Sequence, residues 1–356
     1  MAEPSRQDLK FLFIPVSSAE GIGEYMRSLI LADAVVSRWP QAQIHFILNR
    51  DAPYAANCPY AADLLDETPT KRVAAVNRII SDYRPDVAIF DASGRRTQLQ
   101  HAQHCGAKVV FISQHRRKRS RGLKWKRICA TDSHLVVQPH FFIGDISWLE
   151  RFKLWLLHKS EPLVIGPVFC PPNQARQTAL LQQYQLQSDA FWLFNAGSGG
   201  HRVDGILVAD AFAKAAAAMY QQTGMTCIVV YGPNYPQALP QLPGVIGIAA
   251  INNTDFISLL SAAKGAVLAG GDTLLQALAL HVPTLAVSVS KDQFARVDSC
   301  VRQQLCLKAD FNAAALVEAS RQLQEPQTIN RLKQQMASQG LSNGLDAAIA
   351  QIEALL

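Results

Sequence analysis

Three short stretches of the sequence combine glycines with polar side chains where an apolar run gives way to a helical pattern. These stretches are SSAEGIGEYMR at 17–27, NAGSGGH at 195–201 and AGGDT at 269–273. Glycine allows tight turns and a close approach of the backbone to a ligand, and a helix N-terminus offers unpaired N–H groups to an anion. The three stretches therefore predict loops that bind phosphate groups, with a plain packing turn as the alternative for each.

The second stretch has the fullest phosphate-binding pattern of the three. Gly197, Gly199 and Gly200 leave several backbone N–H groups able to point inward, and Ser198 adds a hydroxyl. We predict that this loop enters a helix directly, over 203–222.

The third stretch is predicted to join a strand to a helix. Gly270 and Gly271 follow the apolar run at 266–269, and either Asp272 or Thr273 is expected to cap the helix that comes next. Such a turn again brings backbone N–H groups to the end of a strand.

Two carboxylates are candidates for a general base. Glu24 lies in the first stretch, and Asp91 follows an apolar strand in the segment IFDASG. A carboxylate can accept a proton from a reacting hydroxyl when it lies within hydrogen-bonding reach. The alternatives are a solvated ion pair of Glu24 with Arg27, three residues further on, and a turn or capping role for Asp91.

A run of basic residues interrupts an otherwise slightly acidic chain. The chain has 34 Lys+Arg, 28 Asp+Glu and a formal net charge of +6. Subtracting the eight cations of the run leaves −2 for the rest, which excludes a generally basic nucleic-acid coat. The run predicts either a solvated, mobile loop or a patch for an anionic membrane or acceptor, with Trp125 able to enter the interface. Its cations are Arg116, Arg117, Lys118, Arg119, Arg121, Lys124, Lys126 and Arg127.

An aromatic segment follows the basic run at 141–159. Trp148, Phe152, Trp155 and Leu156 recur at helical spacing and make one apolar stripe. A stripe of this kind is typical of a helix packed on a core, and a membrane anchor is the alternative.

Apolar, β-rich runs alternate with helical patterns along both halves of the chain, which predicts parallel sheets covered by helices. A helix is expected at 22–39 and a last helix at 345–356. The expected strands are 10–16, 43–48, 86–90, 108–112 and 134–138 in the first half, and 191–195, 226–231, 245–248, 266–269 and 284–288 in the second.

The length of 356 residues predicts two domains, and the proline-rich stretch GPVFCPPN at 166–173 favours a boundary near residue 168. We therefore expect domains at 1–167 and 168–356. Seven scattered cysteines without a Cys-x-x-Cys pair indicate neither a disulfide framework nor a zinc site. The charged N-terminus and the absence of a long apolar run predict a cytoplasmic protein.

The third stretch and its surroundings resemble the donor-binding half of GT-B glycosyltransferases, in particular the MurG-like N-acetylglucosaminyltransferases and the PseG-like sugar-nucleotide hydrolases. Those families carry a small-Gly-x-x-Thr-x-x-Glu run, a Gly-x-Pro whose proline lies seven residues after the Glu, and then an Asp-Gln pair. Here the run reaches Gln276, the proline is Pro283, and the pair is Asp292 and Gln293. The segment GIGEYMRSL at 21–29 resembles the Gly-x-Gly-His-x-x-Arg-x-Leu opening of the hydrolase-like members.

The resemblance implies a GT-B α/β fold, in which two Rossmann-like domains face a cleft and the last helix packs back on the first domain. It implies that the second domain binds a nucleoside diphosphate-sugar and that the first holds a glycan or lipid-linked acceptor. The implied donor-binding residues are Gly197, Ser198, Gly199, Gly200, Gly270, Gly271, Asp272, Thr273, Gln276, Asp292 and Gln293. The implied acceptor-side residues are Gly21, Gly23, Arg27 and His115.

Three residues depart from the family pattern. Glu24 replaces a histidine, Gln276 replaces the ribose-binding glutamate, and His281 replaces the glycine before the proline. The first change puts a carboxylate where the families have an imidazole. The second keeps an oxygen for a ribose hydroxyl but loses its charge.

The predicted activity is sugar transfer from a nucleoside diphosphate-sugar to a hydroxyl of a lipid-linked or cell-envelope glycan, with a carboxylate base. No metal or cofactor is expected, since the sequence has no Asp-x-Asp pair and no His/Cys cluster at ligand spacing. A sugar-nucleotide hydrolase or epimerase of the same fold is one alternative. A nucleic-acid-binding protein is another, but it would leave the glycine loops unexplained, so no nucleic-acid partner is expected.

Overall fold

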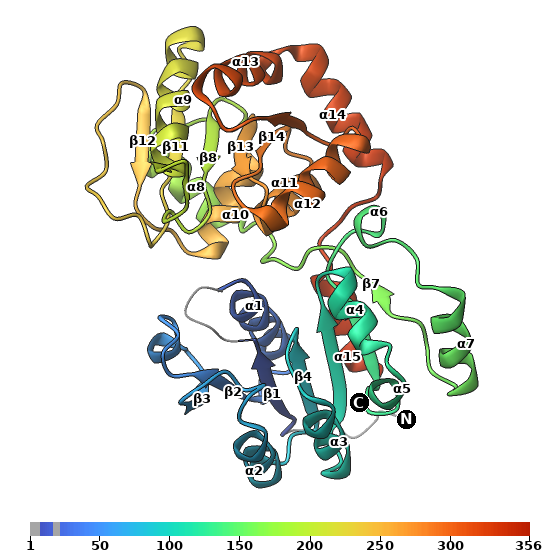
Figure 1. Ribbon diagram of the computed structural model, residues 1–356. Coiled ribbons are helices and arrows are strands. Elements are labelled where there is room, and N and C mark those ends of the chain that lie inside the picture. The colour runs from blue at the N-terminus through green and yellow to red at the C-terminus, as the bar shows by residue number, and fades with distance from the viewer. Residues whose placement is uncertain (1–7, 17–21) are drawn as a thin grey trace, which may run out of the picture. The chain divides into compact units, whose positions relative to one another are not determined.

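The computed structural model describes residues 8–16 and 22–356, apart from the side chain of Asp292. The chain divides into two compact units. Unit 1 comprises the chain up to Val168 together with Gly344–Leu356, and unit 2 comprises Phe169–Asn343. Each unit is a parallel sheet covered by helices (Figure 1).

Within the described residues, the sheet of unit 1 has seven strands in the order β3-β2-β1-β4-β5-β6-β7, and every neighbouring pair is parallel. The strands are β1 (Lys10–Pro15), β2 (Gln43–Asn49), β3 (Ala61–Leu65), β4 (Val87–Asp91), β5 (Lys108–Ser113), β6 (Ser133–Val136) and β7 (Leu163–Val164). The central strands are mostly buried and apolar because helices cover both faces.

The helices of unit 1 form a layer on each face of this sheet. They are α1 (Gly23–Arg38), α2 (Val73–Tyr83), α3 (Arg96–His104), α4 (Arg116–Gly122), α5 (Trp125–Ile128), α6 (His140–Ile143), α7 (Trp148–Leu156) and α15 (Leu345–Glu353), with a short 3₁₀ helix, η1 (Ala55–Asn57). Leu12, Ile14 and Phe90 pack with α2 and α3 in one core cluster. On the other face, α1 packs on β1, and α15 packs on α1 although it comes last in the chain.

Within unit 2 the described residues form a six-stranded parallel sheet in the order β12-β11-β8-β13-β14-β15. Its strands are β8 (Trp192–Asn195), β11 (Cys227–Val230), β12 (Val245–Ile248), β13 (Gly265–Ala269), β14 (Thr284–Val287) and β15 (Leu307–Ala309). Its helices are α8 (Gln174–Gln183), α9 (Val208–Thr223), α10 (Asn253–Ala262), α11 (Asp272–Ala279), α12 (Lys291–Arg302), α13 (Ala313–Gln324) and α14 (Pro326–Ser338).

In both units the chain reverses its direction of travel across the sheet beside the first strand. In unit 1 it runs from β1 outward to β2 and β3 and then returns to β4 on the other side of β1. In unit 2 it runs from β8 to β11 and β12 and then returns to β13. Ligands of open parallel sheets bind at the carboxyl ends of the strands at such a switch point. The loops after β1, β4, β8 and β13 therefore define the two places to look for chemistry.

A short β-hairpin replaces the start of the helix predicted over 203–222. The helix expected over 203–222 is α9, which begins at Val208, because β9 (Arg202–Val203) and β10 (Ile206–Leu207) form a hairpin first. Asp204 and Gly205 join its strands, both at positive φ (49° and 79°). Asp-Gly is the residue pair that a two-residue hairpin turn favours. The glycine-rich loop after β8 therefore leads into a hairpin and not directly into a helix.

No helix among the described residues is long and apolar enough to span a bilayer.

Candidate functional site

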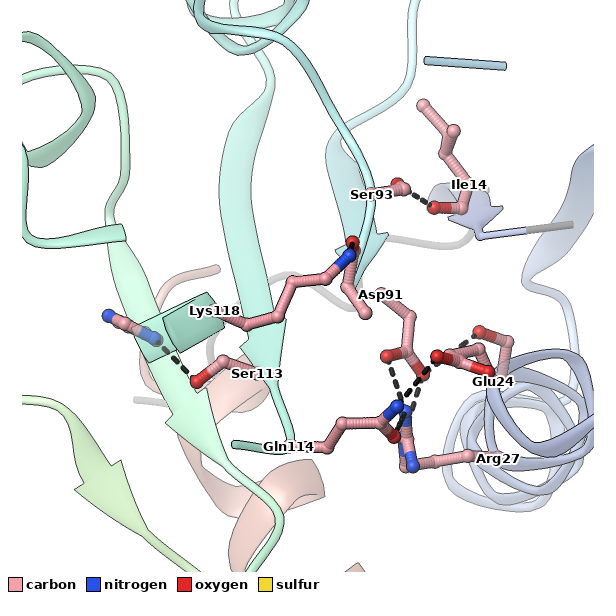
Figure 2. A network of polar contacts seen from close by, with 11 residues as sticks. Ile14, Glu24, Arg27, Asp91, Ser93, Ser113, Gln114 and Lys118 are labelled. Atoms are coloured by element: carbon pink, nitrogen blue, oxygen red, sulfur yellow. Dashed lines mark hydrogen bonds and ion pairs between the residues drawn. The ribbon is translucent and has the colours of Figure 1, made fainter. Parts of the chain in front are cut away.

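A buried ion pair lies at the switch point of unit 1. Arg27, on the second turn of α1, donates from Nε to Asp91 Oδ2 at 2.8 Å and from an Nη atom to Asp91 Oδ1 at 2.7 Å. Asp91 is the last residue of β4 and has no exposed surface, and Arg27 is 5% exposed. Arginine suits this arrangement because its planar guanidinium matches both carboxylate oxygens at once. The pair joins α1 to the carboxyl end of β4 (Figure 2).

Gln114 extends this pair to Glu24. It follows β5, its Oε1 accepts a hydrogen bond from Arg27 at 3.0 Å, and its Nε2 donates to Glu24 Oε1 at 2.7 Å. Figure 2 shows the resulting chain of contacts from Asp91 through Arg27 and Gln114 to Glu24. Because the amide oxygen of Gln114 accepts from the guanidinium of Arg27, its amide nitrogen faces the carboxylate of Glu24. The orientation of Glu24 thus depends, through the half-buried Gln114, on the buried Arg27.

Two basic side chains from the start of α4 stand beside this network. The ammonium of Lys118 donates to the backbone oxygen of Ala92, and burial followed by the charge of Arg121 lowers the pKa of Lys118. Burial also lowers the pKa of His115, and the positive charge of Lys118 adds to this effect. His115 Nδ1 accepts a hydrogen bond from the backbone N–H of Lys118 at 3.3 Å, which requires that nitrogen to be unprotonated. A neutral imidazole and a half-buried cation therefore accompany Glu24.

A second imidazole, that of His134 on β6, is half-buried beside β5. His134 pairs with the hydroxyl of Ser113 at 2.9 Å, and burial lowers the pKa of His134 to about 3. Ser113 has no exposed surface. This Ser–His pair is therefore part of the interior and stays neutral under ordinary conditions.

The basic run is not a mobile loop, because it forms α4 and α5 and several of its cations have partners inside unit 1. Arg119 donates to the backbone oxygens of Gly144 and Asp145, the latter at 2.8 Å. Arg127 donates to Gly94 O at 2.9 Å, and burial lowers its pKa to about 10. Arg119 and Arg127 are buried, so neither belongs to the predicted surface patch. The exposed cations of the run are Arg116, Arg117, Arg121, Lys124 and Lys126.

The prediction that the aromatic stripe packs on the core is wrong. Trp148 and Trp155 of α7 are 72% and 70% exposed, and Phe152 and Leu156 are also exposed. Leu154, on the opposite side of the helix, is the residue that packs on unit 1, against Leu123, Ile128 and Ile146. The spacing correctly identified an amphipathic helix but assigned the wrong face to the interior.

At the glycine-rich edge of unit 2, the loop after β8 interlocks with the loop after β11. In the loop after β8, Asn195 Oδ1 accepts from the backbone N–H of Gly197 at 3.1 Å, and Ser198 O accepts from Asn234 N–H at 2.8 Å. A Cβ on Gly199, at φ +90°, would lie 2.2 Å from the backbone oxygen of Tyr231, and a Cβ on Gly232 would lie 2.5 Å from Gly197 O. The loops after β8 and β11 thus fit together only because these positions lack side chains.

The loop after β13 is held from α12. Arg296 donates to Gly270 O at 2.8 Å and forms an ion pair with Asp272 at 3.2 Å. A Cβ on Gly270 would lie 2.4 Å from a methyl carbon of Val297, so the loop packs directly on α12. The cap of α11 is Gly271, without a side-chain hydrogen bond, and Asp272 is the first helical residue. The prediction that Asp272 or Thr273 is the cap is therefore wrong by at least one residue.

The remaining predicted donor residues have the following positions. Gln293 is buried, and its Oε1 accepts from the backbone N–H of Val289 at 3.0 Å, so it shapes the turn between β14 and α12. Thr273 and Gln276 are half-buried on α11. Gly200 lies next to the loop after β11, 3.4 Å from Asn234 O when a Cβ is placed on it. The side chain of Asp292 lies outside the described part of the chain.

On the acceptor side, Gly23 is the first residue of α1, and Gly21 lies outside the described residues. Two residues that complete the sites, Gln114 and Arg296, were not among the predicted ones. Gln114 directly follows a fully buried strand, and this position at the switch edge is a signal that could have found it. Arg296 has no such signal, because it reaches Gly270 from another helix.

Within the part of the chain that the structure describes, no three His, Cys, Asp or Glu side chains come together in a group that could hold a metal ion.

No protein-family model matches the sequence. No curated protein matches it either.

The structure as a whole is similar to solved glycosyltransferases. A spinosyn forosaminyltransferase has a TM-score of 0.67 at 12% identity, covering 98% of this chain and 99% of that one. MurG of Acinetobacter baumannii has a TM-score of 0.65 at 12% identity, covering 97% and 99%. The glycotransferase of kitacinnamycin has a TM-score of 0.65 at 17% identity, covering 99% and 100%. Because the likeness extends over nearly the whole of each chain, it shows that this protein has the GT-B fold.

Proposed function

We propose that the protein is a glycosyltransferase that moves a sugar from a nucleoside diphosphate-sugar to a hydroxyl group of an acceptor. The observation that carries the proposal is the pairing of two different switch points in one GT-B chain. Unit 2 has interlocked glycine loops and the N-terminus of α11 at its switch point, and unit 1 presents a carboxylate held by a hydrogen-bonded network whose inner ion pair is buried. The first suits a diphosphate, and the second suits an acceptor hydroxyl.

In this proposal the loops after β8 and β13 bind the diphosphate of the donor. The loop after β13 lies at the start of α11, where the partial positive charge of the helix N-terminus favours an anion. Backbone N–H groups held in place by packing need not reorganise as negative charge grows on the departing diphosphate. The expectation that no metal cofactor is needed remains a prediction.

Glu24 is the proposed base. Its carboxylate would take the proton of the acceptor hydroxyl while the hydroxyl oxygen bonds to the anomeric carbon. The bond from that carbon to the diphosphate oxygen breaks, and the nucleoside diphosphate leaves with the bonding electrons. Gln114 holds one oxygen of Glu24 at 2.7 Å, and Glu24 is partly exposed, so the carboxylate can meet a substrate.

Asp91, the other candidate base, has a positioning role in this proposal. It has no exposed surface, and both of its oxygens accept hydrogen bonds from Arg27. A carboxylate in this state would have to give up a charge-assisted pair before it could accept a proton. Its effect on the reaction is instead to fix Arg27, which in turn fixes Gln114.

We further propose that the acceptor is an anionic, lipid-linked or cell-envelope glycan. The support is the positive charge beside Glu24, namely the half-buried ammonium of Lys118 together with the exposed side chains of Arg117 and Arg121. A lipid-linked acceptor would bring the protein to a membrane surface, which the exposed cations of α4 and α5 also favour.

The experiment is incubation of the protein with a panel of nucleotide sugars, with and without glycan acceptors, and measurement of released nucleoside diphosphate and free sugar. The proposal predicts nucleotide release that requires an acceptor. Stoichiometric free sugar without any acceptor would instead support a sugar-nucleotide hydrolase. If no nucleotide sugar is consumed under either condition, the proposal of glycosyl transfer fails.

A further inference from the structure

Helix α7 has one face that packs on the core of unit 1 and an opposite face that is exposed. Leu154 packs against Leu123, Ile128 and Ile146, and this small core fixes the helix to α5 and to the junction of α4 and α5. At 100° per residue, the other large apolar side chains of α7 fall in an arc of about 120° centred opposite Leu154. These side chains are Trp148, Leu149, Phe152, Trp155 and Leu156, and all five are exposed. This outer surface is called the α7 face below.

The α7 face concentrates apolar surface that is scattered elsewhere. Among the described residues, ten large hydrophobic side chains are exposed, and five of them belong to this nine-residue helix. Another of these ten exposed side chains is Trp125, which belongs to the neighbouring helix α5. An exposed apolar patch of this kind marks a surface that is covered in the working protein.

The α7 face is held rigidly. Ser147 and Glu150 form a capping box at the start of α7, with Ser147 N–H donating to Glu150 Oε2 at 2.9 Å. Just before this cap, Arg119 of α4 donates to the backbone oxygens of Gly144 and Asp145. Figure 1 shows α7 at the outer side of unit 1, beyond β7. The aromatic side chains are therefore presented by a fixed helix.

Basic side chains flank the α7 face, and two carboxylates compensate the charge of one of them. By the same helical geometry, Arg151 lies at one margin of the apolar arc and Lys153 at the other, whereas Glu150 points toward the body of the unit. Arg151 pairs with Asp145 at 3.5 Å and with Glu161 at 3.2 Å. The neighbouring α5 adds exposed Lys124 and Lys126 on either side of Trp125. Basic side chains with long apolar stems at the edge of an aromatic face suit a helix that lies in a membrane interface.

We propose that the α7 face binds an anionic lipid bilayer, with α7 parallel to the membrane plane and its aromatic side chains among the lipid headgroups. The aromatic centre of the face selects this occupant, together with Lys153 at one margin; Arg151 at the other margin is paired with Asp145 and Glu161. Tryptophan is the residue that prefers this boundary, with an apolar ring and a polar N–H. The proposal does not depend on the sugar-transfer reaction, since it concerns only where the chain is held.

The test is flotation of the purified full-length chain with vesicles of phosphatidylcholine containing phosphatidylglycerol, and with vesicles of phosphatidylcholine alone. We expect binding to the mixed vesicles, weaker binding to the neutral ones, and a blue shift of tryptophan emission on binding. The double variant Trp148→Ala/Trp155→Ala should bind at least about tenfold more weakly, because insertion strength follows buried apolar area. Phe294→Ala, at an exposed aromatic residue of unit 2, is the matched control and should bind like the unchanged chain.

A second variant separates charge from insertion. Arg151→Gln/Lys153→Gln should weaken binding at low salt and lose this effect when salt screens the interaction. Unaltered circular dichroism of both double variants verifies that their folds are intact. The proposal is overturned if the unchanged chain binds neither kind of vesicle, or if Trp148→Ala/Trp155→Ala binds as well as Phe294→Ala. It is equally overturned if the α7 face proves to join two copies of the chain, as dissociation of a dimer by that variant would show.

Discussion

The two switch points of this GT-B chain differ in composition: polar side chains form the first, and glycine backbone forms the second. In unit 1, four charged or polar side chains from α1, β4 and the end of β5 form a connected network, and two of them are buried ions. In unit 2, the corresponding edge consists largely of glycine backbone. Arg296 supports it from α12 by donating to the backbone oxygen of Gly270. An edge made of side chains can move a proton, whereas an edge made of backbone N–H groups can hold an anion without carrying a charge. The comparison suggests a division of labour between the units.

The largest expected effect is on turnover, from Glu24→Gln in unit 1. The amide keeps the size of the side chain but cannot accept the proton of the acceptor, so kcat should fall about 100- to 10 000-fold. The dissociation constant of the nucleoside diphosphate, measured by titration calorimetry, should not change. A variant that turns over at the normal rate would remove Glu24 as the base and would erase the division of labour.

The next effect is on stability, from Arg27→Met. This change leaves Asp91 as a buried charge without its guanidinium partner, and breaking such a pair costs about 3–5 kcal/mol of unfolding free energy. The matched variant in unit 2 is Arg176→Met, whose pair with Asp255 has an equally short contact of 2.7 Å but an exposed arginine. Because that arginine is exposed and Asp255 also accepts a hydrogen bond from Asn252 at 2.9 Å, the loss should be smaller. If the two variants lose the same amount of unfolding free energy in urea, burial of the Arg27–Asp91 pair does not make it more important for stability than the exposed pair.

The third effect is on nucleotide binding, from Gly199→Ala in unit 2. The added Cβ would collide with Tyr231 O, so the loops after β8 and β11 must separate, and nucleotide affinity should fall about tenfold, or about 1.4 kcal/mol. Gly224→Ala is the control, because Gly224 also has positive φ but meets nothing within 4 Å. If both variants bind nucleotide normally, the interlocked loops are not the anion site.

The last effect, about 1.4 kcal/mol for each pH unit, is a pH dependence that belongs to unit 1. The pKa of His134 is about 3 in the folded chain, below the value near 6.5 of an unfolded histidine. Below about pH 6.5 the unfolded state therefore binds a proton that the folded state does not, and stability falls by about 1.4 kcal/mol per pH unit down to about pH 3. Above pH 6.5 this contribution is constant. In urea titrations at several pH values, His134→Gln should lose this part of the slope, and an unaltered slope would contradict the assignment.

The sequence predicts the strands at the centre of each sheet because parallel strands buried on both faces are continuous apolar runs. It does not predict the edge strands β3, β7 and β15, since β7 and β15 have only two and three residues and β3 mixes an aspartate with alanines and leucines. The hairpin before α9 was signalled by Asp204-Gly205, but the alanine-rich pattern that follows suggested a helix from Val203. Local turn chemistry was decisive there.

The candidate site residues also divide into those with a local sequence signal and those without one. The glycine loops are readable in sequence because their signal is local. The partner of Asp91 is not, because Arg27 lies 64 residues away and either residue alone fits a surface ion pair or a turn. Helix α7 shows a further limit, since periodicity defines a stripe but does not reveal whether protein or solvent faces it.

The central claim is that unit 2 binds a nucleoside diphosphate through its glycine loops. The most direct test is the thermal unfolding of the unchanged chain and of Gly199→Ala with UDP, dTDP, GDP or CMP. A ligand at about 100 times its dissociation constant stabilises the folded state by about 2.7 kcal/mol. We predict that at least one of the three diphosphates raises the melting temperature of the unchanged chain more than the monophosphate CMP does, and that Gly199→Ala loses this rise. No rise with any nucleotide, or an equal rise in both proteins, would contradict the claim.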